Sequence, residues 1–596
     1  MTKTPKKHPW LNQYPVNIDW ESEQPKKSMV DVFDQSVKKF GSKNFLSFMG
    51  KKYTYKEIGD MVDHMAKNLQ DMGVKKGDKI GLSLPNSPFY VVSYYAAMKA
   101  GATVVNFNPL YPKDQMEELI KESDTKMMIT LDLKDMGPVL EDIKKDKDSP
   151  LQTVVTAKIS DALPWHKKAL YKIGGLLGKT GQAKCPDSLS FKDLLKNNGK
   201  PKKVEINPED DIAVLQFTGG TTGTPKAAML SHANLTANTN QTGQWFTSMR
   251  EGQEKFLAVL PFFHVFAMTV EMNMSMQYGA EIVMLPKFDI KETLDTIQKE
   301  RPTVFAGVPT LYHAINTYPK LDKYDLTCLK TCIAGGAGLP KKTKEAFEKL
   351  TGCHLFEGYG LSETSPVATA NPLDPKLQKL GSIGLPMPGT KIKIKDLEFP
   401  DKDCPIGVKG EICLKGPQVM KGYLNNKKAT DEAMTKDGYF RTGDVGYMDE
   451  DGYTFICDRI KDMIIAGGYN IYPRKVEDAI LKHPDIDEVI VAGVEDKYRG
   501  ETVKAFIVAK EGKTVSDAAL KEFLKDKLSK IEMPKIIEWR DELPKTMIGK
   551  PDKKALLAEE AAKAGKDFNQ AAPKNDNKPP AKLVIHKQKK AQGPKR

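Results

Sequence analysis

The chain has 596 residues, of which 40% are hydrophobic and 8% aromatic, so it can bury several cores, and its length predicts about three or four structural units. It has no run of about 18 apolar residues and no apolar stretch behind its basic start, which argues against a membrane span and against a secretory signal. The net charge is +13, and residues 561–596 supply most of it, with ten Lys or Arg against two Asp or Glu.

Strands and helices are expected to alternate through the first half of the chain. The clearest unit is a strand over residues 79–85, a helix over 87–101 and a strand over 102–109, with Gly101 at a position that favours a left-handed backbone. This alternation predicts an α/β fold with mainly parallel sheets covered by helices. Further strands are expected over residues 127–131, 152–157, 212–217, 255–261, 280–286, 303–309 and 331–336, with helical patterns between most of them, such as 290–302.

One segment, residues 163–179, has the pattern of a basic amphipathic helix. Two readings stay open: a helix that lies on a membrane surface, and a helix packed on the body of the protein. Its apolar side would hold Trp165, Ala169, Ile173, Leu176 and Leu177, with Lys167, Lys168 and Lys172 off that side.

The stretch TGGTTGTPKAAML, residues 218–230, follows an apolar strand and has the composition of a phosphate-binding loop. Its glycines let the backbone turn and present N–H groups, its threonines add hydroxyls, and its lysine adds a positive charge. The kinase-type loop is excluded because Ala227 follows Lys226, and the dinucleotide fingerprint is absent. The phosphate-binding candidates are Thr218, Gly219, Gly220, Thr221, Thr222, Gly223, Thr224 and Lys226.

After Pro386 the sequence pattern changes to short strands of alternating apolar and polar residues, separated by Gly and Asp turns. This pattern is typical of a small antiparallel, barrel-like part. Beyond Arg459 a helix, two strands and a further helix over 515–534 predict a small α+β unit. We therefore expect an N-terminal domain over residues 1–458, a C-terminal domain over 459–560 and a disordered basic tail over 561–596. Solvation of this tail is expected, and a contact with anionic lipid or nucleic acid is the alternative.

The seven cysteines are scattered, and the closest pair, Cys328 and Cys332, lacks the second pair that a zinc site would need. Reduced, buried thiols in a cytoplasmic protein are therefore expected.

The loop at 218–230 resembles the phosphate loop of adenylate-forming enzymes, a superfamily that includes acyl-CoA synthetases, firefly luciferase and peptide-synthetase adenylation domains. From about Trp10 to about Lys554, six further segments resemble its motifs in the expected order, and the whole most resembles the bacterial long-chain fatty acid–CoA ligases. Those segments are residues 98–112, 261–268, 357–366, 439–446, 458–477 and 543–554.

This resemblance implies a reaction in two steps. A fatty acid attacks the α-phosphate of ATP to give acyl-AMP and pyrophosphate, and CoA then takes the acyl group and releases AMP. Because the first step brings anions together, it needs Mg²⁺ and cationic side chains more than an acid–base pair. The implied catalytic residues are Lys550, Glu363 and His264, with Glu363 as the metal ligand.

The resemblance also assigns the nucleotide contacts. Tyr359 would stack on adenine, Asp444 would accept the ribose hydroxyls, and Arg459 would contact ribose or phosphate, with Gly358, Gly360 and Ser362 beside them. Ser362 stands where the superfamily more often has Thr, and Pro551 departs from its usual pattern after the catalytic lysine.

In this superfamily the C-terminal domain rotates between the two steps. Lys461 would be the hinge, and Gly467, Gly468, Tyr469 and Asn470 would reach the CoA side. The acyl tunnel would hold Phe266, Met268, Gly335 and Gly336, with Phe262, Phe263, Met272, Met274 and Met276 nearby; core packing is the alternative for these methionines.

Other functions stay open from the sequence. A fatty acyl-AMP ligase that loads a carrier protein is disfavoured because no insertion is evident between residues 366 and 381. A medium-chain or aryl acid–CoA ligase is a second alternative, and an inactive scaffold or lipid-surface binder is a third. The expected partners are fatty acid, ATP and CoA, with no nucleic acid. A homodimer and a peripheral contact with the inner face of the membrane are left open.

Overall fold

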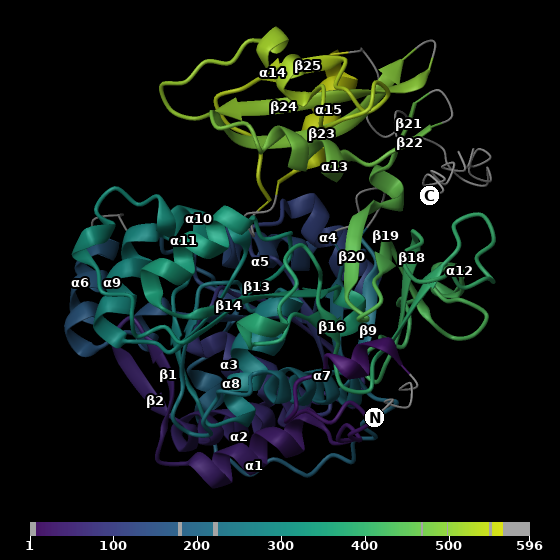
Figure 1. Ribbon diagram of the computed structural model, residues 1–596. Helices are drawn as coiled ribbons and strands as arrows, with labels where there is room; N and C mark the ends of the chain where they lie inside the picture. Colours follow the sequence, from purple (N-terminus) through teal and green to yellow (C-terminus); the bar gives the residue numbers. More distant parts are fainter. Residues whose placement is uncertain are drawn as a thin grey trace, which may run out of the picture.

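The computed structural model describes residues 8–176, 181–218, 225–466, 469–496, 499–546 and 551–563. Two large sheets and one small antiparallel sheet make up the N-terminal part, and a separate sheet makes up the C-terminal part, which lies above α10, α11 and β20 in Figure 1. The α/β class predicted from the alternation of strands and helices is confirmed.

The first large sheet has the strand order β7-β6-β5-β3-β4-β8-β9, and its pairs are parallel except for β8 with β9. Gly101, with a φ of 87°, follows the end of its first covering helix as predicted. The strands are β3 (Lys79–Ser83), β4 (Thr103–Asn106), β5 (Met127–Leu131), β6 (Thr153–Ala157), β7 (Leu189–Ser190), β8 (Ile212–Phe217) and β9 (Ala227–Ser231), and the helices are α3 (Pro88–Lys99), α4 (Lys113–Ser123) and α5 (Gly137–Lys145).

The second large sheet has the order β16-β15-β14-β13-β12-β10-β11-β1-β2, with a parallel centre and antiparallel pairs at both edges. Its strands are β1 (Asn44–Phe48), β2 (Lys51–Thr54), β10 (Lys255–Ala258), β11 (Glu281–Met284), β12 (Val304–Gly307), β13 (Thr331–Ala334), β14 (His354–Gly360), β15 (Val367–Ala370) and β16 (Leu385–Pro386). Its helices are α9 (Ile290–Glu300), α10 (Pro309–Asn316), α11 (Lys341–Thr351), the π-helix η4 (Ala267–Asn273) and α8 (Met274–Gln277).

Helix α3 joins the two large sheets. Eleven of its residues, from Pro88 to Met98, are buried, as expected for a helix that is apolar on all sides. The Tyr95 hydroxyl donates to Asn273 of η4 at 2.9 Å, and the Tyr90 hydroxyl donates to the Phe262 carbonyl at 2.9 Å. These bonds satisfy polar groups inside the core and fix the second sheet against the first.

Helices α1 (Met29–Phe40) and α2 (Tyr55–Asp71) lie along the lower side of Figure 1, and α7 (His232–Trp245), most of whose residues are buried, lies above them. Local sequence starts α2, because the Thr54 side chain accepts from the Glu57 amide and the Glu57 carboxylate accepts from the Thr54 amide. Such a cap stabilises a helix by about 1 kcal/mol.

The antiparallel part predicted after Pro386 is present as a four-stranded sheet with the order β17-β18-β19-β20. It comprises β17 (Lys391–Lys395), β18 (Gly410–Lys415), β19 (Phe440–Met448), β20 (Thr454–Arg459) and the short helix α12 (Lys427–Glu432). A single 3-10 turn, Ile460–Asp462, leads from β20 into the C-terminal part.

The C-terminal part has its own hydrophobic cluster around Val476, Val491 and Leu520. The helix expected over 515–534 is wrong beyond Leu524, where α14 ends; farther along the chain, the Ser529 amide and hydroxyl both bond to Glu532 in a separate turn. The elements are β21 (Ile464–Ala466), β22 (Tyr469–Ile471), α13 (Pro473–Ile480), β23 (Ile486–Asp496), β24 (Gly500–Ala509), α14 (Asp517–Leu524), β25 (Ile536–Trp539) and α15 (Lys553–Lys563).

The basic amphipathic segment forms helix α6 (Trp165–Leu176). Trp165 is 84% exposed and Leu170 is 68% exposed. Lys167 instead turns inward and donates to the Met49 carbonyl at 2.9 Å, and Lys168 pairs with Asp161 at 2.8 Å. One part of the helix thus contacts the body of the protein while Trp165 and Leu170 face outward, and both interpretations of this segment stay predictions.

The sequence predicted no membrane-spanning helix and reduced cysteines. No helix in the described ranges is long and apolar enough to cross a membrane. All seven cysteines are free, and three of them, Cys332, Cys353 and Cys413, are buried while the other four are partly exposed. The basic tail lies outside the described residues beyond Lys563.

Candidate active site

Tyr359, Asp444 and Arg459 meet where the second large sheet approaches the antiparallel sheet. The Tyr359 hydroxyl, at the end of β14, donates to Oδ2 of Asp444 at 2.5 Å, and Nε of Arg459 lies 3.2 Å from Oδ1 of the same carboxylate. Asp444 and Arg459 are directly opposite in the β19–β20 pair, so sheet register positions them. Three of the residues predicted for the nucleotide site are thus brought together.

Burial governs the protonation of this cluster. It raises the pKa of Asp444, and the adjacent Arg459 guanidinium opposes that rise by favouring the carboxylate. Burial, together with the charge of Asp444, raises the pKa of Tyr359 well above its ordinary value, so the phenol stays a donor. A ribose hydroxyl that approaches Asp444 would have to share the carboxylate with these two donors.

Glycines flank Tyr359 for a steric reason. A Cβ on Gly360 would lie 2.0 Å from the Pro366 carbonyl oxygen, which no side chain can tolerate. Gly358 is packed more loosely, with its nearest contact at 3.1 Å on Ile333. Ser362 is partly buried in the 3-10 turn that follows β14.

A second cluster forms around Tyr423, a residue that the sequence did not single out. Its hydroxyl donates to Oε1 of Glu363 at 2.8 Å, and Nζ of Lys226 lies 5.2 Å from the centre of its ring. Tyr423 therefore brings the expected metal ligand and the lysine of the phosphate loop to one place. Burial raises the pKa of Glu363, and the bond from Tyr423 and the charge of Arg459 oppose that rise.

This cluster fits Mg²⁺. One carboxylate oxygen of Glu363 is held by a phenol, and a hard oxygen ligand of this kind suits a cation that keeps waters and phosphate oxygens as its other ligands. Within the described ranges, no three His, Cys, Asp or Glu side chains are grouped as a metal site of their own.

Thr442 is a further residue without an assigned role in the sequence, although it lies inside the quoted segment 439–446. Its hydroxyl accepts from the Asp444 amide at 3.0 Å and donates to the Ile412 carbonyl at 2.8 Å. It thereby fixes the backbone from which the Asp444 carboxylate projects. Neither Thr442 nor Tyr423 carried a local signal beyond an ordinary polar residue.

The phosphate loop begins and ends on the β8–β9 hairpin. The Thr218 amide bonds to the Lys226 carbonyl at 2.8 Å, and Phe217 pairs with Ala227. Residues 219–224, which include the predicted Gly219, Gly220, Thr221, Thr222, Gly223 and Thr224, lie outside the described residues. At the described end of this segment, Lys226 lies over the ring of Tyr423, which is bonded to Glu363.

Three of the four residues expected at the acyl tunnel, Phe266, Met268 and Gly335, are buried. Phe266 packs on Gly335, where a Cβ would come within 3.1 Å of the ring, and Met268 is fully buried with its sulfur 3.5 Å from the Asn106 amide nitrogen. His264 is partly buried, and its Nδ1 accepts from the Phe266 amide at 3.3 Å. Gly336 instead is exposed, in a left-handed turn. The expected tunnel methionines Met272, Met274 and Met276 are fully buried.

Only some of the residues predicted for the hinge and the CoA side are among those that the structure describes. Lys461 lies in the single turn at Ile460–Asp462, and Tyr469, 46% exposed, and Asn470 lie on β22. Gly467, Gly468 and Lys550 lie outside the described residues. Lys553, at the start of α15, is within electrostatic range of Asp458, the residue before Arg459.

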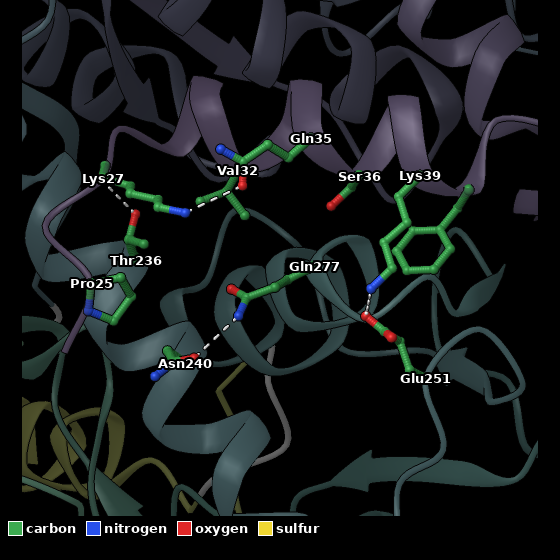
Figure 2. Close-up of a pocket in the computed structure, with 11 residues that line it drawn as sticks. Pro25, Lys27, Val32, Gln35, Ser36, Lys39, Thr236, Asn240, Glu251 and Gln277 are labelled. Atoms are coloured by element: carbon green, nitrogen blue, oxygen red, sulfur yellow. Dashed lines mark hydrogen bonds and ion pairs between the residues drawn. The ribbon is translucent and has the colours of Figure 1, made fainter. Parts of the chain in front are cut away.

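A cavity of about 300 Å³ lies elsewhere in the molecule, between α1, α7 and α8. Figure 2 shows that the charged side chains of this cavity are bonded to other residues that line it. Lys39 pairs with Glu251 at 2.5 Å, and Nζ of Lys27 donates to Oε1 of Gln35 at 3.3 Å. None of the residues predicted for the nucleotide or acyl site lines this cavity.

Comparison with known proteins adds to this geometry. The family model described as AMP-binding enzyme matches residues 33–424, and that of the AMP-binding enzyme C-terminal domain matches residues 475–550. The long-chain-fatty-acid–CoA ligase of Bacillus subtilis (strain 168) is 44% identical over 558 residues, which are 93% of this chain and 98% of that protein. The protein of the same name from Escherichia coli O6:H1 is 35% identical over 563 residues, again 93% and 98%.

Solved structures are similar over the same extent. ATP-bound MatB from Rhodopseudomonas palustris has a TM-score of 0.76 at 28% identity and covers 90% of this chain and 100% of its own. The anthranilate CoA ligase AuaEII has a TM-score of 0.78 at 24% identity and covers 92% of this chain and 99% of its own, a likeness of fold.

Proposed function

Because the chain belongs to the AMP-binding enzyme family, we propose that it is a long-chain-fatty-acid–CoA ligase. It activates a fatty acid with ATP to acyl-AMP and pyrophosphate, and it then transfers the acyl group to CoA. The proposal rests on the similarity to relatives of this name over nearly the whole of both chains. The two clusters around Asp444 and Glu363 supply side chains suited to this chemistry.

In the first step, the nucleotide would lie between these two clusters. Asp444 would bind the ribose hydroxyls, with Arg459 near ribose or phosphate and Tyr359 against the adenine. Glu363 would hold Mg²⁺, which when bound neutralises charge on the phosphates. Lys226 and the Thr and Gly residues of the loop would bind the phosphates and so orient the α-phosphate for attack.

The fatty acid would enter from the side of η4. His264 and Phe266 would flank the carboxylate, and the acyl chain would run past Gly335 toward the buried methionines. Apolar burial on this side would exclude water from the mixed anhydride and limit its hydrolysis. Lys550 would bridge the fatty acid carboxylate and the α-phosphate in this step only.

The orientation of the C-terminal domain favours the first step. Lys553, three residues after Lys550, is within electrostatic range of Asp458, which directly precedes Arg459, while Tyr469 on β22 is 46% exposed. For the second step, rotation about Lys461 would withdraw Lys550 and bring Gly467, Gly468, Tyr469 and Asn470 toward the acyl-AMP.

Helix α6 supports a peripheral contact with the inner face of the membrane. Trp165 and Leu170 project outward, as apolar side chains of an interfacial helix do, while Lys167 is bonded to the Met49 carbonyl and Lys168 to Asp161. A cytoplasmic enzyme with this contact is the location that we propose. A homodimer stays a prediction, which sedimentation of the purified protein would test.

One assay with purified protein, MgATP and palmitate tests the proposed function. We expect pyrophosphate release followed by CoA-dependent formation of palmitoyl-CoA. Release without thioester would instead indicate a ligase that loads a carrier protein, and neither product would indicate a scaffold. A panel of acids from six to twenty carbons, with benzoate, would separate the long-chain assignment from the medium-chain and aryl alternatives.

A further inference from the structure

Arg474, in the first turn of α13, makes a close contact with the N-terminal domain at Gly338. A Cβ on Gly338 would lie 1.9 Å from Nη2 of Arg474 and 2.7 Å from its Cζ. The guanidinium therefore occupies the space that any side chain at this position would take. The glycine and the arginine come from different domains, so their fit defines one relative orientation of the two.

Glu357 of β14 adds charge to this contact. Its Oε1 accepts from the Leu339 amide at 3.3 Å, and Arg474 is the strongest of the positive charges that act on it, ahead of Lys344 of α11. Lys344 is already bonded to Glu348 at 2.5 Å and to the Leu355 carbonyl at 2.6 Å. Burial raises the pKa of Glu357 to about 7, and the charge of Arg474 opposes that rise.

The backbone of Arg474 is also bonded next to the predicted nucleotide site. Its backbone amide bonds to Oδ2 of Asp458 at 2.9 Å, and Asp458 directly precedes Arg459. On β14, Glu357 lies two residues before Tyr359. Arg474 is thus linked both to β20, which provides Arg459, and to β14, which provides Tyr359.

We propose that Arg474 is a positioning residue whose contact with Gly338, opposite Glu357, holds the C-terminal domain in the orientation of the adenylate-forming step. This inference rests on the proposed two-step function. Rotation of the domain would carry α13 away from Gly338, so the contact exists in one orientation and not in the other. A contact of this kind changes the populations of the two orientations, because its free energy contributes to only one of them.

The test measures the two half-reactions separately on the full-length protein. With Arg474→Gln we expect pyrophosphate release with palmitate to fall by about tenfold, a typical size for coupling between two states. Transfer to CoA from supplied palmitoyl-AMP is expected to stay unchanged or to rise. Lys475→Gln is the matched control, because the next residue of the same helix pairs at 2.5 Å with Glu532 inside the C-terminal domain, and it should leave the ratio of the two rates unchanged.

A second variant isolates the contact itself. In Gly338→Ala the new methyl group would displace the guanidinium, so this change should slow the first half-reaction while Arg474 is present. In the Arg474→Gln background the same change should cost little, since the group that it displaces is gone.

Two outcomes would overturn the inference: an equal fall of both half-reactions in Arg474→Gln, or an equal cost of Gly338→Ala in both backgrounds. If Arg474→Gln does not fold, Arg474→Lys, which keeps the charge but not the planar group, is measured in its place with the same expected ratio. A wild-type protein that performs neither half-reaction would refute the proposed function rather than the role of Arg474.

Discussion

The Tyr423 hydroxyl donates a hydrogen bond of 2.8 Å to Oε1 of Glu363. This bond favours the ionised form of a carboxyl whose pKa burial raises. Because only the carboxylate binds Mg²⁺ well, Tyr423 would act on the metal through Glu363 without touching it.

Tyr423→Phe should therefore weaken Mg²⁺ binding in the first half-reaction. Loss of one such bond corresponds to about 1 kcal/mol, or roughly a fivefold rise in the Mg²⁺ concentration needed for half-maximal rate. The pH at which activity reaches half its plateau should also rise, since Glu363 would hold its proton more tightly. An unchanged Mg²⁺ titration would rule out this role for Tyr423.

Asp444→Asn should lower kcat/KM for ATP by about 10 to 100-fold, because the amide no longer balances Arg459 and accepts sugar hydroxyls more weakly. The KM for palmitate should change little. Lys395→Gln is the control: Lys395 is also buried in the antiparallel sheet and pairs with Asp403 at 2.7 Å, away from the cluster. A similar loss of ATP affinity in the control would mean that Asp444 acts through the stability of the sheet.

Lys550→Ala should reduce pyrophosphate release by on the order of 100-fold or more, as expected when a charge directed at the transition state is removed. Thioester formation from supplied acyl-adenylate should be retained. Rapid-quench measurement of each step distinguishes these effects, and a parallel loss of both would show that the role assigned to Lys550 is wrong.

Trp165→Ala combined with Leu170→Ala should abolish sedimentation with vesicles of phosphatidylglycerol and phosphatidylcholine. Withdrawing two large apolar side chains from the lipid interface costs at least about 2 kcal/mol, or more than tenfold in binding. Activity on a dispersed, short-chain substrate should persist. Phe399→Ala, which removes an aromatic side chain that is 56% exposed elsewhere, serves as the control and should bind vesicles normally.

Glu357→Gln should change how stability depends on pH. With a folded-state pKa of about 7 against an ordinary value of 4.5, the native protein keeps a proton that the unfolded chain loses across this interval. The contribution of Glu357 to stability therefore falls as pH rises from about 4.5 to about 7. Melting curves of wild type and variant should diverge over this window, and parallel curves would contradict the shift.

Local patterns in the sequence predicted the sheets well. Alternation of apolar strands and helices predicted the parallel pairing that is found around β3, and Gly101 follows the end of its helix as expected. The pattern failed at α14, which ends at Leu524 although apolar residues continue beyond it. Periodicity marks the apolar face of a helix but not the residue at which the helix ends.

The candidate site was predicted in parts but not as an arrangement. Tyr359 and Asp444 were each assigned to the nucleotide, yet the bond between them joins residues 85 positions apart. Tyr423, 60 positions from Glu363, had no signal of its own. Contacts of this length depend on how sheets pack, which short motifs do not encode. The same holds for Gly338. A side chain at this position would clash with the guanidinium of Arg474, a contact that only the folded structure reveals.

Helix α3 is enclosed on nearly every side, and its tyrosines contact Asn106 of β4 in the first large sheet and Phe262 and Asn273, which follow β10 of the second. The two large sheets are therefore expected to move as one block. Large displacements must then be absorbed by the one turn at Ile460–Asp462. Adding a single residue to that turn would lengthen the tether by up to about 3.6 Å, enough to misalign the two halves of the enzyme while every contacting side chain stays the same.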